Sequence, residues 1–144
     1  MILMKIKFST AWKASTQPRK QRKYRYNAPL HIKGKFLASH LVKELRAKHG
    51  LRSLRVRTGD KVRVLRGQFA GREGKVDRVD VARSHVYVSK VEQIKKDGAT
   101  KVPYPLDASN LMIVEFDTSD KRRMDALKAR EEKTKQRKQD EKKD

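Results

Sequence analysis

Alternating apolar and polar residues dominate the middle of this 144-residue chain, from residue 51 to residue 116. Alternation with a period of two is typical of strands that bury one face. It is present, or nearly so, in the segments SLRVR, KVRVL, GKVDRVD, HVYVSKV and LMIVEF. We expect these strands to point Val62, Val64, Val76, Val86 and Val88 inward, leaving Lys61, Arg63, Lys75, Tyr87 and Ser89 on the other face.

Short turns separate the predicted strands. Asp97–Gly98 lies between extended segments and is a strong hairpin signal, because a type I′ turn needs positive φ at both central positions. Pro103 and Pro105 confine VPYP to an edge strand or a connection. About five short strands with tight turns favour a mainly β fold, a small closed or half-closed barrel rather than a sandwich. The candidate structural glycines are Gly59, Gly67, Gly71, Gly74 and Gly98.

Residues 29–50 have a different period. Leu37, Leu41 and Leu45 recur every four residues, which predicts a helix with one apolar stripe that packs on the barrel. Gly50 suits a left-handed cap at its end. Gly34 weakens the first turn, so one helix and two short helices remain equal alternatives.

The two ends of the chain are polar. Residues 1–28 have no hydrophobic period, which predicts an extended arm. In residues 117–144, Met124 and Leu127 could hold one helical turn against the body, and nothing apolar follows Arg130. We expect this charged tail to be partly helical or disordered. The start, where Met1 and Met4 are both candidate initiators, has no apolar run of signal-peptide length.

The charge is unevenly distributed. The formal net charge is +21, and 38% of the residues are charged. Residues 1–50 hold 13 Lys and Arg against one carboxylate, Glu44. A block of one sign repels itself and needs a polyanionic partner. Nucleic acid is the leading candidate, and an anionic membrane surface is the rival.

Two segments combine cations with groups that contact nucleic acid. In the arm, tyrosines stand among the cations and could stack on bases. In the glycine-rich loop after KVRVL, arginines can bind phosphate, Gln68 can bond a base or sugar, and Phe69 can stack on an unpaired base. The alternatives are a solvated tail and a plain hairpin loop. The candidate RNA-binding residues are Arg19, Lys20, Arg22, Lys23, Tyr24, Arg25, Tyr26, Lys33, Lys35, Arg63, Arg66, Gln68, Phe69, Arg72 and Lys75.

Other classes of function find little support. The chain has no cysteine, which removes disulfides and thiolate zinc sites. His31, His40 and His49 are nine residues apart and would face different sides of a helix, so they make no ligand pair. We therefore expect no catalysis, metal, cofactor or small-molecule substrate. The leucine stripe is too narrow for a membrane-surface helix, and no run approaches a bilayer span.

The segment GDKVRVLRGQFAGREGKVDRVD, residues 59–80, resembles a KOW motif. Such motifs occur on SH3-like barrels in large-subunit ribosomal proteins and in transcription-elongation factors. The flanking segments QPRKQRKYRYNAPLH, HLVKELRAKHGLRSLRVR and YPLDASNLMI resemble the archaeal and eukaryotic form of the KOW-containing large-subunit ribosomal protein, number twenty-four in the universal naming. GREGKV lacks a residue that many eukaryotic relatives carry, which favours the archaeal branch.

This resemblance implies a structural protein of the cytoplasmic large ribosomal subunit, whose partners are the rRNA and neighbouring ribosomal proteins. It further implies binding to the 5′ part of the large-subunit rRNA, a role in nucleating assembly, and a place near the exit of the polypeptide tunnel. By position it points to arm residues 19–26, loop residues 66–72 and Lys75. The alternatives are a KOW-type transcription-elongation factor and an architectural nucleic-acid-binding protein.

Overall fold

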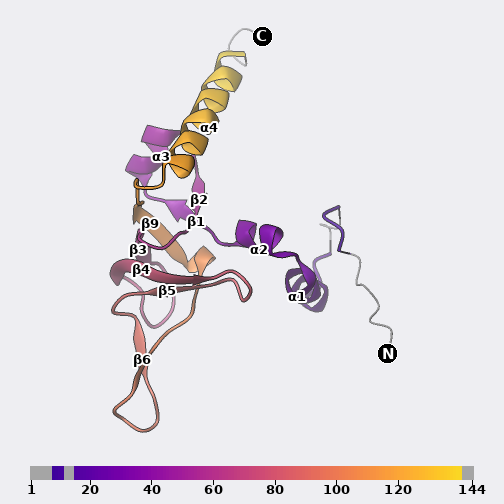
Figure 1. The fold of residues 1–144 in the computed structure, drawn as a ribbon. Coiled ribbons are helices and arrows are strands. Elements are labelled where there is room, and N and C mark those ends of the chain that lie inside the picture. Colours follow the sequence, from indigo (N-terminus) through magenta and orange to yellow (C-terminus); the bar gives the residue numbers. More distant parts are fainter. Residues whose placement is uncertain (1–7, 12–14, 141–144) are drawn as a thin grey trace.

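The computed structural model describes residues 8–11 and 15–140, which form a mainly β protein with helices at both ends (Figure 1). The helices are α1 (Pro18–Asn27), α2 (Leu30–Phe36), α3 (Lys43–His49), the 3-10 turn η1 (Ala108–Asn110) and α4 (Lys121–Asp140). The strands are β1 (Ala38–Leu41), β2 (Ser53–Arg55), β3 (Lys61–Val64), β4 (Glu73–Asp80), β5 (His85–Val88), β6 (Glu92–Ile94), β7 (Lys101–Pro103), β8 (Leu106–Asp107) and β9 (Leu111–Glu115).

One seven-stranded sheet has the order β2-β1-β9-β3-β4-β5-β8. Adjacent strands in this sheet are antiparallel, except for β1 and β9, which are parallel to each other. The sheet does not close into a barrel, because its edge strands β2 and β8 are only three and two residues long and pair with no further strand in the described part. Leu54 from β2 and Leu106 from β8 nevertheless belong to the same hydrophobic core. The closed form of the expected barrel is therefore wrong, while the mainly β fold is confirmed.

The predicted strand faces are confirmed. Val62, Val64, Val76, Val86 and Val88 are each at most 2% exposed and form the centre of the core. All five predicted strands are present, as is the hairpin around Asp97–Gly98, where β6 pairs with β7. Its turn is not the expected type I′, because Gly98 has positive φ and Asp97 does not. Gly98 has φ +74°, and the Asp97 carboxylate accepts hydrogen bonds from Thr100, chiefly from its hydroxyl, which lowers the pKa of Asp97. This hairpin projects beyond the sheet (Figure 1).

In the segment 29–50 the alternative of two short helices is confirmed over that of one helix, but the strand between them was not expected. The segment forms the two short helices α2 and α3, with strand β1 between them. Leu37 and Leu41 are almost completely buried, but Ser39 between them is buried too, with its hydroxyl donating to the Ala108 carbonyl at 2.5 Å. Residues four apart share a face in a strand as well as in a helix, so the leucine spacing fits both. Residues 38–41 form a strand because they pair with β2 and β9. The sheet therefore begins at Ala38 rather than at residue 51.

The predicted extended arm is also corrected, because α1 is a helix. Its sequence, PRKQRKYRYN, starts with Pro18 in the first turn and contains no β-branched residue. Arg, Lys and Gln have good helix propensity, and proline is tolerated in a first turn. No residue of α1 is buried, so its sequence needs no apolar stripe and gives no periodic signal. Trp12 and residues 1–7 of the predicted arm lie outside the described residues.

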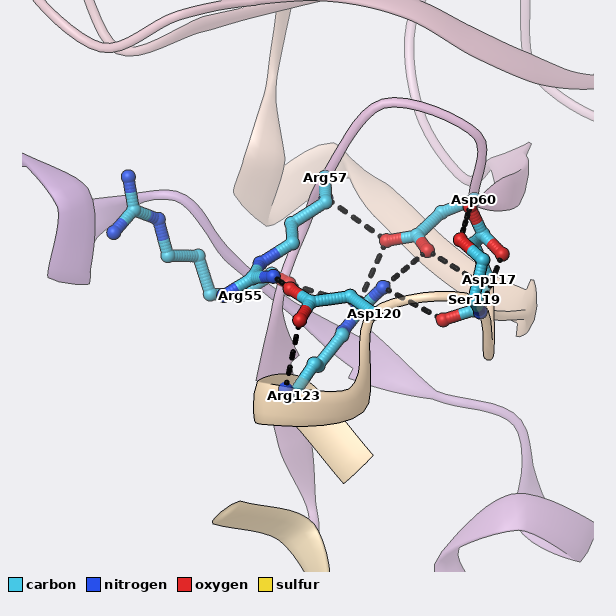
Figure 2. A network of polar contacts seen from close by, with 7 residues as sticks. All are labelled: Arg55, Arg57, Asp60, Asp117, Ser119, Asp120 and Arg123. Carbon is cyan, nitrogen blue, oxygen red and sulfur yellow. Dashed lines mark hydrogen bonds and ion pairs between the residues drawn. The ribbon is translucent and has the colours of Figure 1, made fainter. Parts of the chain in front are cut away.

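Helix α4 is tied to the sheet through a buried ion pair (Figure 2). The Arg123 guanidinium donates to both carboxylate oxygens of Asp60, at 2.6 and 2.9 Å, and to the Arg55 carbonyl at 3.1 Å. Asp60 is fully buried and also accepts the backbone N–H groups of Arg57 and Asp117. The four bonds fill the acceptor capacity of the carboxylate.

Further along α4, apolar and polar contacts continue the attachment. Leu127 is 3% exposed and belongs to the core, with Met124 packed against it. Glu131 bonds His49 at 2.5 Å, which places α4 beside α3 (Figure 1). The expectation that Met124 and Leu127 would hold a helical turn is confirmed, and the helix runs on from that turn to Asp140.

Replacing Val64 with Ala should lower the free energy of unfolding by about 1–3 kcal/mol, because it leaves a cavity at a fully buried site. Val102→Ala is the matched control, since it makes the same change on the exposed hairpin, where Val102 is 37% exposed. Urea unfolding of the whole chain measures both. Equal losses would contradict the assigned strand faces.

Replacing Arg123 with Met should cost about 3–5 kcal/mol, because it leaves the buried Asp60 carboxylate without its cation. Arg122→Met changes the exposed neighbour in the same helix and should stay within about 0.5 kcal/mol. Urea unfolding gives the global effect, and hydrogen exchange at the Leu127 amide reports on α4. A Leu127 amide equally protected in both variants would show that the pair does not hold the helix.

Candidate nucleic-acid interface

Helix α1 is a cationic rod. Arg19, Lys20, Arg22, Lys23 and Arg25 are all exposed on it, and α1 contains no carboxylate. The helix turns by about 100° per residue, so these side chains surround it on several sides rather than forming one stripe. Figure 1 shows α1 set apart from the sheet and joined to it through α2. This placement leaves the cations open to a large polyanion.

The two arm tyrosines have different environments. Tyr24 is half-buried, with its ring centroid 4.8 Å from that of Phe8 and 6.2 Å from that of Phe36. Tyr24 therefore packs α1 against α2, and its predicted role in stacking on RNA bases is not supported by this placement. Tyr26 is 81% exposed, and its ring has the Lys33 ammonium 5.8 Å from its centroid. Of the two rings, that of Tyr26 is the one presented to solvent.

The candidate residues of the loop between β3 and β4 also differ in their exposure to solvent. Arg66 and Gln68 are exposed, as predicted. Phe69 is only 8% exposed, belongs to the core and packs on Tyr104 with ring centroids 5.1 Å apart. The predicted stacking of Phe69 on an unpaired base is therefore corrected: burial of its large apolar surface places it under the loop. Arg72 lies 5.0 Å over the Phe69 ring and remains exposed to solvent.

The candidate glycines serve two purposes. Positive φ occurs at Gly59, Gly67, Gly71 and Gly98. At Gly71, φ is +83° and nothing lies within 4 Å of the position of a Cβ, so the requirement is conformational alone. Gly74 is different, since a Cβ there would lie 2.5 Å from the carbonyl oxygen of Ser89, the residue that follows strand β5. Its requirement is the close approach of two backbones.

The remaining candidate RNA-binding residues lie on α2, β3 and β4. Lys35 and Lys75 are exposed. Lys33 donates to the Ala82 carbonyl at 3.0 Å, which joins α2 to the turn between β4 and β5. Arg63 forms an ion pair with Glu73 on the adjacent strand. Such an exposed pair contributes only about 0–1 kcal/mol, so a phosphate could replace the carboxylate.

The structure also reveals basic positions that the sequence analysis missed. A β-bulge in β4 places Arg78 opposite Tyr87, with its guanidinium 4.3 Å from the ring centroid. Arg83 lies in the β4–β5 turn near the end of α1. A groove between β2 and α4 is lined by Arg55, Arg57, Arg122, Arg123 and Arg130. The period-two pattern marked the strands, but only the bulge and the turn determine which arginines lie together.

Within the described ranges, no group of three or more His, Cys, Asp or Glu could hold a metal ion. Across those ranges, too, no helix is long and apolar enough to cross a bilayer.

The described residues thus combine a mainly β fold with a cationic helix, a basic loop and an exposed tyrosine. Comparison with known sequences gives the family. The family of the eukaryotic ribosomal proteins L26 and their archaeal counterparts of the L24 type matches residues 15–130. The chain belongs to this family of ribosomal proteins, which is structural and not enzymatic.

Three archaeal relatives, each named "Large ribosomal subunit protein uL24", are similar over most of the chain. The protein of Methanocorpusculum labreanum is 53% identical over 117 residues, covering 81% of this chain and 96% of the relative. Those of Methanoculleus marisnigri and Methanospirillum hungatei are each 51% identical over 113 residues, covering 78% of this chain and 93% of the relative. The predicted resemblance to the archaeal form is confirmed.

Replacing Phe69 with Ala should lower the free energy of unfolding by about 3–5 kcal/mol, because the ring is buried under the loop. Gln68→Ala changes the exposed neighbour and should stay within about 0.5 kcal/mol. Thermal and urea unfolding of the two variants provide the comparison. A fully stable Phe69→Ala protein would return this ring to the candidate RNA-binding residues.

Proposed function

We propose that this chain is a structural constituent of the large ribosomal subunit and binds its rRNA directly. The observation that carries the proposal is helix α1, which presents five exposed cations and no carboxylate in a chain of net charge +21. Family membership supports the same conclusion, since the three archaeal relatives are named as large-subunit proteins.

The proposed interface has two parts with different tasks. The α1 cations contact the phosphate backbone and supply affinity that does not depend on sequence. The loop carrying Arg66, Gln68 and Arg72 approaches the RNA from the sheet, where Gln68 can bond a base edge or a ribose hydroxyl. A folded helix loses less conformational entropy on binding than an extended arm would.

The family resemblance extends the proposal to a location. We place the contacts in the 5′ part of the large-subunit rRNA, near the exit of the polypeptide tunnel, with a role in nucleating assembly of the cytoplasmic subunit. Residues 59–80 would be the KOW motif, and the open sheet a variant of the SH3-like fold. Neighbouring ribosomal proteins would be the remaining partners.

Sucrose-gradient sedimentation of cell extract tests the proposal. The protein should travel with the large subunit and leave it only at high salt. Recovery at the top of the gradient would overturn the ribosomal assignment. Competition between rRNA fragments and duplex DNA adds a second test, because an architectural DNA-binding protein would bind both.

Changing Arg19, Lys20 and Lys23 together to Gln should lower the slope of log affinity against log salt by about 2–3 units, if each contacts one phosphate. Gln retains the helix propensity, and Tyr24 still packs on Phe36. Filter binding to large-subunit rRNA across a salt series measures the slope.

The matched control removes three cations from the projecting hairpin, with Lys95, Lys96 and Lys101 changed to Gln. Its slope should change less than that of the α1 variant. An equal fall in both variants would show that total charge, rather than contact by α1, determines the affinity.

A further inference from the structure

A pocket of about 410 Å³ lies between the end of α1, helix α2 and the β4–β5 turn. Its lining includes Arg25, Tyr26, Lys33, Arg83, His85 and Asp107. These residues come from separate segments of the chain and combine three permanent cations, one carboxylate and one tyrosine ring. Its volume falls within the range that encloses small ligands.

We propose that this pocket holds one unpaired RNA nucleotide, with Tyr26 stacked on the base and Arg25 and Arg83 bound to the phosphate. This inference rests on the proposed rRNA binding and assigns one nucleotide-specific site within it. The ligand class is a guanine nucleotide.

Two hydrogen bonds order the backbone around the pocket. Lys33 joins α2 to the turn through its 3.0 Å bond to the Ala82 carbonyl. Asp80 accepts the Arg83 backbone N–H at 3.0 Å, and this bond lowers the pKa of Asp80 and keeps the carboxylate charged. Ser84 completes the turn in the left-handed region with φ +61°. A turn held in one backbone conformation loses less entropy when a ligand binds beside it.

Tyr26 differs from the other aromatic residues nearby. Tyr24 packs with Phe8 and Phe36, whereas Tyr26 is 81% exposed at the edge of the pocket. A large exposed ring beside cations is the arrangement that proteins use to stack on unpaired bases. Arg25 and Arg83 provide forked donors that suit phosphate oxygens.

Asp107 gives the pocket its base preference. Its nearer carboxylate oxygen lies 3.7 Å from Nδ1 of His85, which is too far for a hydrogen bond. The carboxylate is 53% exposed and keeps its acceptor capacity. Guanine presents N1–H and N2–H donors side by side and can bond both carboxylate oxygens, whereas uracil presents a single N–H donor. The pocket still attracts a phosphate, because the three positive charges of Arg25, Lys33 and Arg83 exceed the one negative charge of Asp107.

The test uses the full-length chain with transcribed large-subunit rRNA. Tyr26→Ala should weaken binding by about 5- to 150-fold with little change in salt slope, because stacking contributes no counterion release. Tyr26→Phe should bind as the unchanged chain does. Tyr87→Ala, outside the pocket on β5, is the matched control and should have a smaller effect. Ultraviolet cross-linking with mass spectrometry should attach a guanosine to Tyr26 or to the β4–β5 turn.

These measurements distinguish a failure of rRNA binding from a failure of the nucleotide pocket. If the unchanged chain fails to bind rRNA, the proposed function itself fails. If it binds and Tyr26→Ala binds equally well, the nucleotide pocket is wrong while rRNA binding stands. Cross-links to uridine, or an Asp107→Asn variant with unchanged affinity, would overturn the guanine preference.

Nuclear magnetic resonance spectra of the free protein distinguish a nucleotide within RNA from a free nucleotide as the ligand. Millimolar GMP should shift the amide signals of Arg83 and Ser84 more than UMP or inorganic phosphate does. Saturation by micromolar GMP would identify a free nucleotide as the ligand and overturn the RNA assignment. Equal shifts with inorganic phosphate would reduce the site to a phosphate site and overturn base stacking.

Discussion

The buried ion pair between Asp60 and Arg123 joins the C-terminal helix α4 to the middle of the sheet. Asp60 sits in the turn before β3, and its carboxylate binds two backbone N–H groups as well as the guanidinium from α4. Burial removes competing water, so the pair is favourable only because every acceptor and most donors are bonded. The same bonds fix the entry to β3, the exit from β9 and the start of α4 (Figure 2). The position of the C-terminal helix follows from this arrangement.

Many carboxylates of the described residues are engaged in hydrogen bonds or ion pairs within the chain. Asp80, Asp97 and Asp117 accept backbone N–H groups in turns, and each has a pKa lowered mainly by hydrogen bonds from the following residues. Glu73, Glu115 and Glu131 are paired with Arg63, Lys61 and His49. These acids satisfy turns and neighbouring cations, and the excess of 38 Lys and Arg over 17 Asp and Glu leaves the chain strongly positive. A surface of one dominant sign attracts a polyanion and would be destabilising without one.

The aromatic residues show a similar division between fold and binding. Tyr24 and Phe36 attach α1 to α2, and Phe69 and Tyr104 close the core beneath the β3–β4 loop. Tyr26 alone among these is exposed, and it borders the pocket shared with the β4–β5 turn. The α1 contacts therefore do more than hold cations: they bring an aromatic ring beside Arg83, far away in sequence. Affinity from charge and selectivity from one nucleotide would then come from the same helix.

The sequence by itself determined the strand faces, the hairpin at Asp97–Gly98, the cationic character of α1 and the family, because these depend on local period, turn chemistry and motif. It could not decide between strand and helix at Leu37–Leu41, since spacing by four satisfies both periods and pairing with β2 and β9 settles the choice. It could not separate Phe69 from a solvent-facing ring, because burial depends on what the loop covers. The Asp60–Arg123 pair joins residues 63 positions apart, and the pocket at Tyr26 joins segments from opposite halves of the chain, so only tertiary packing decides them.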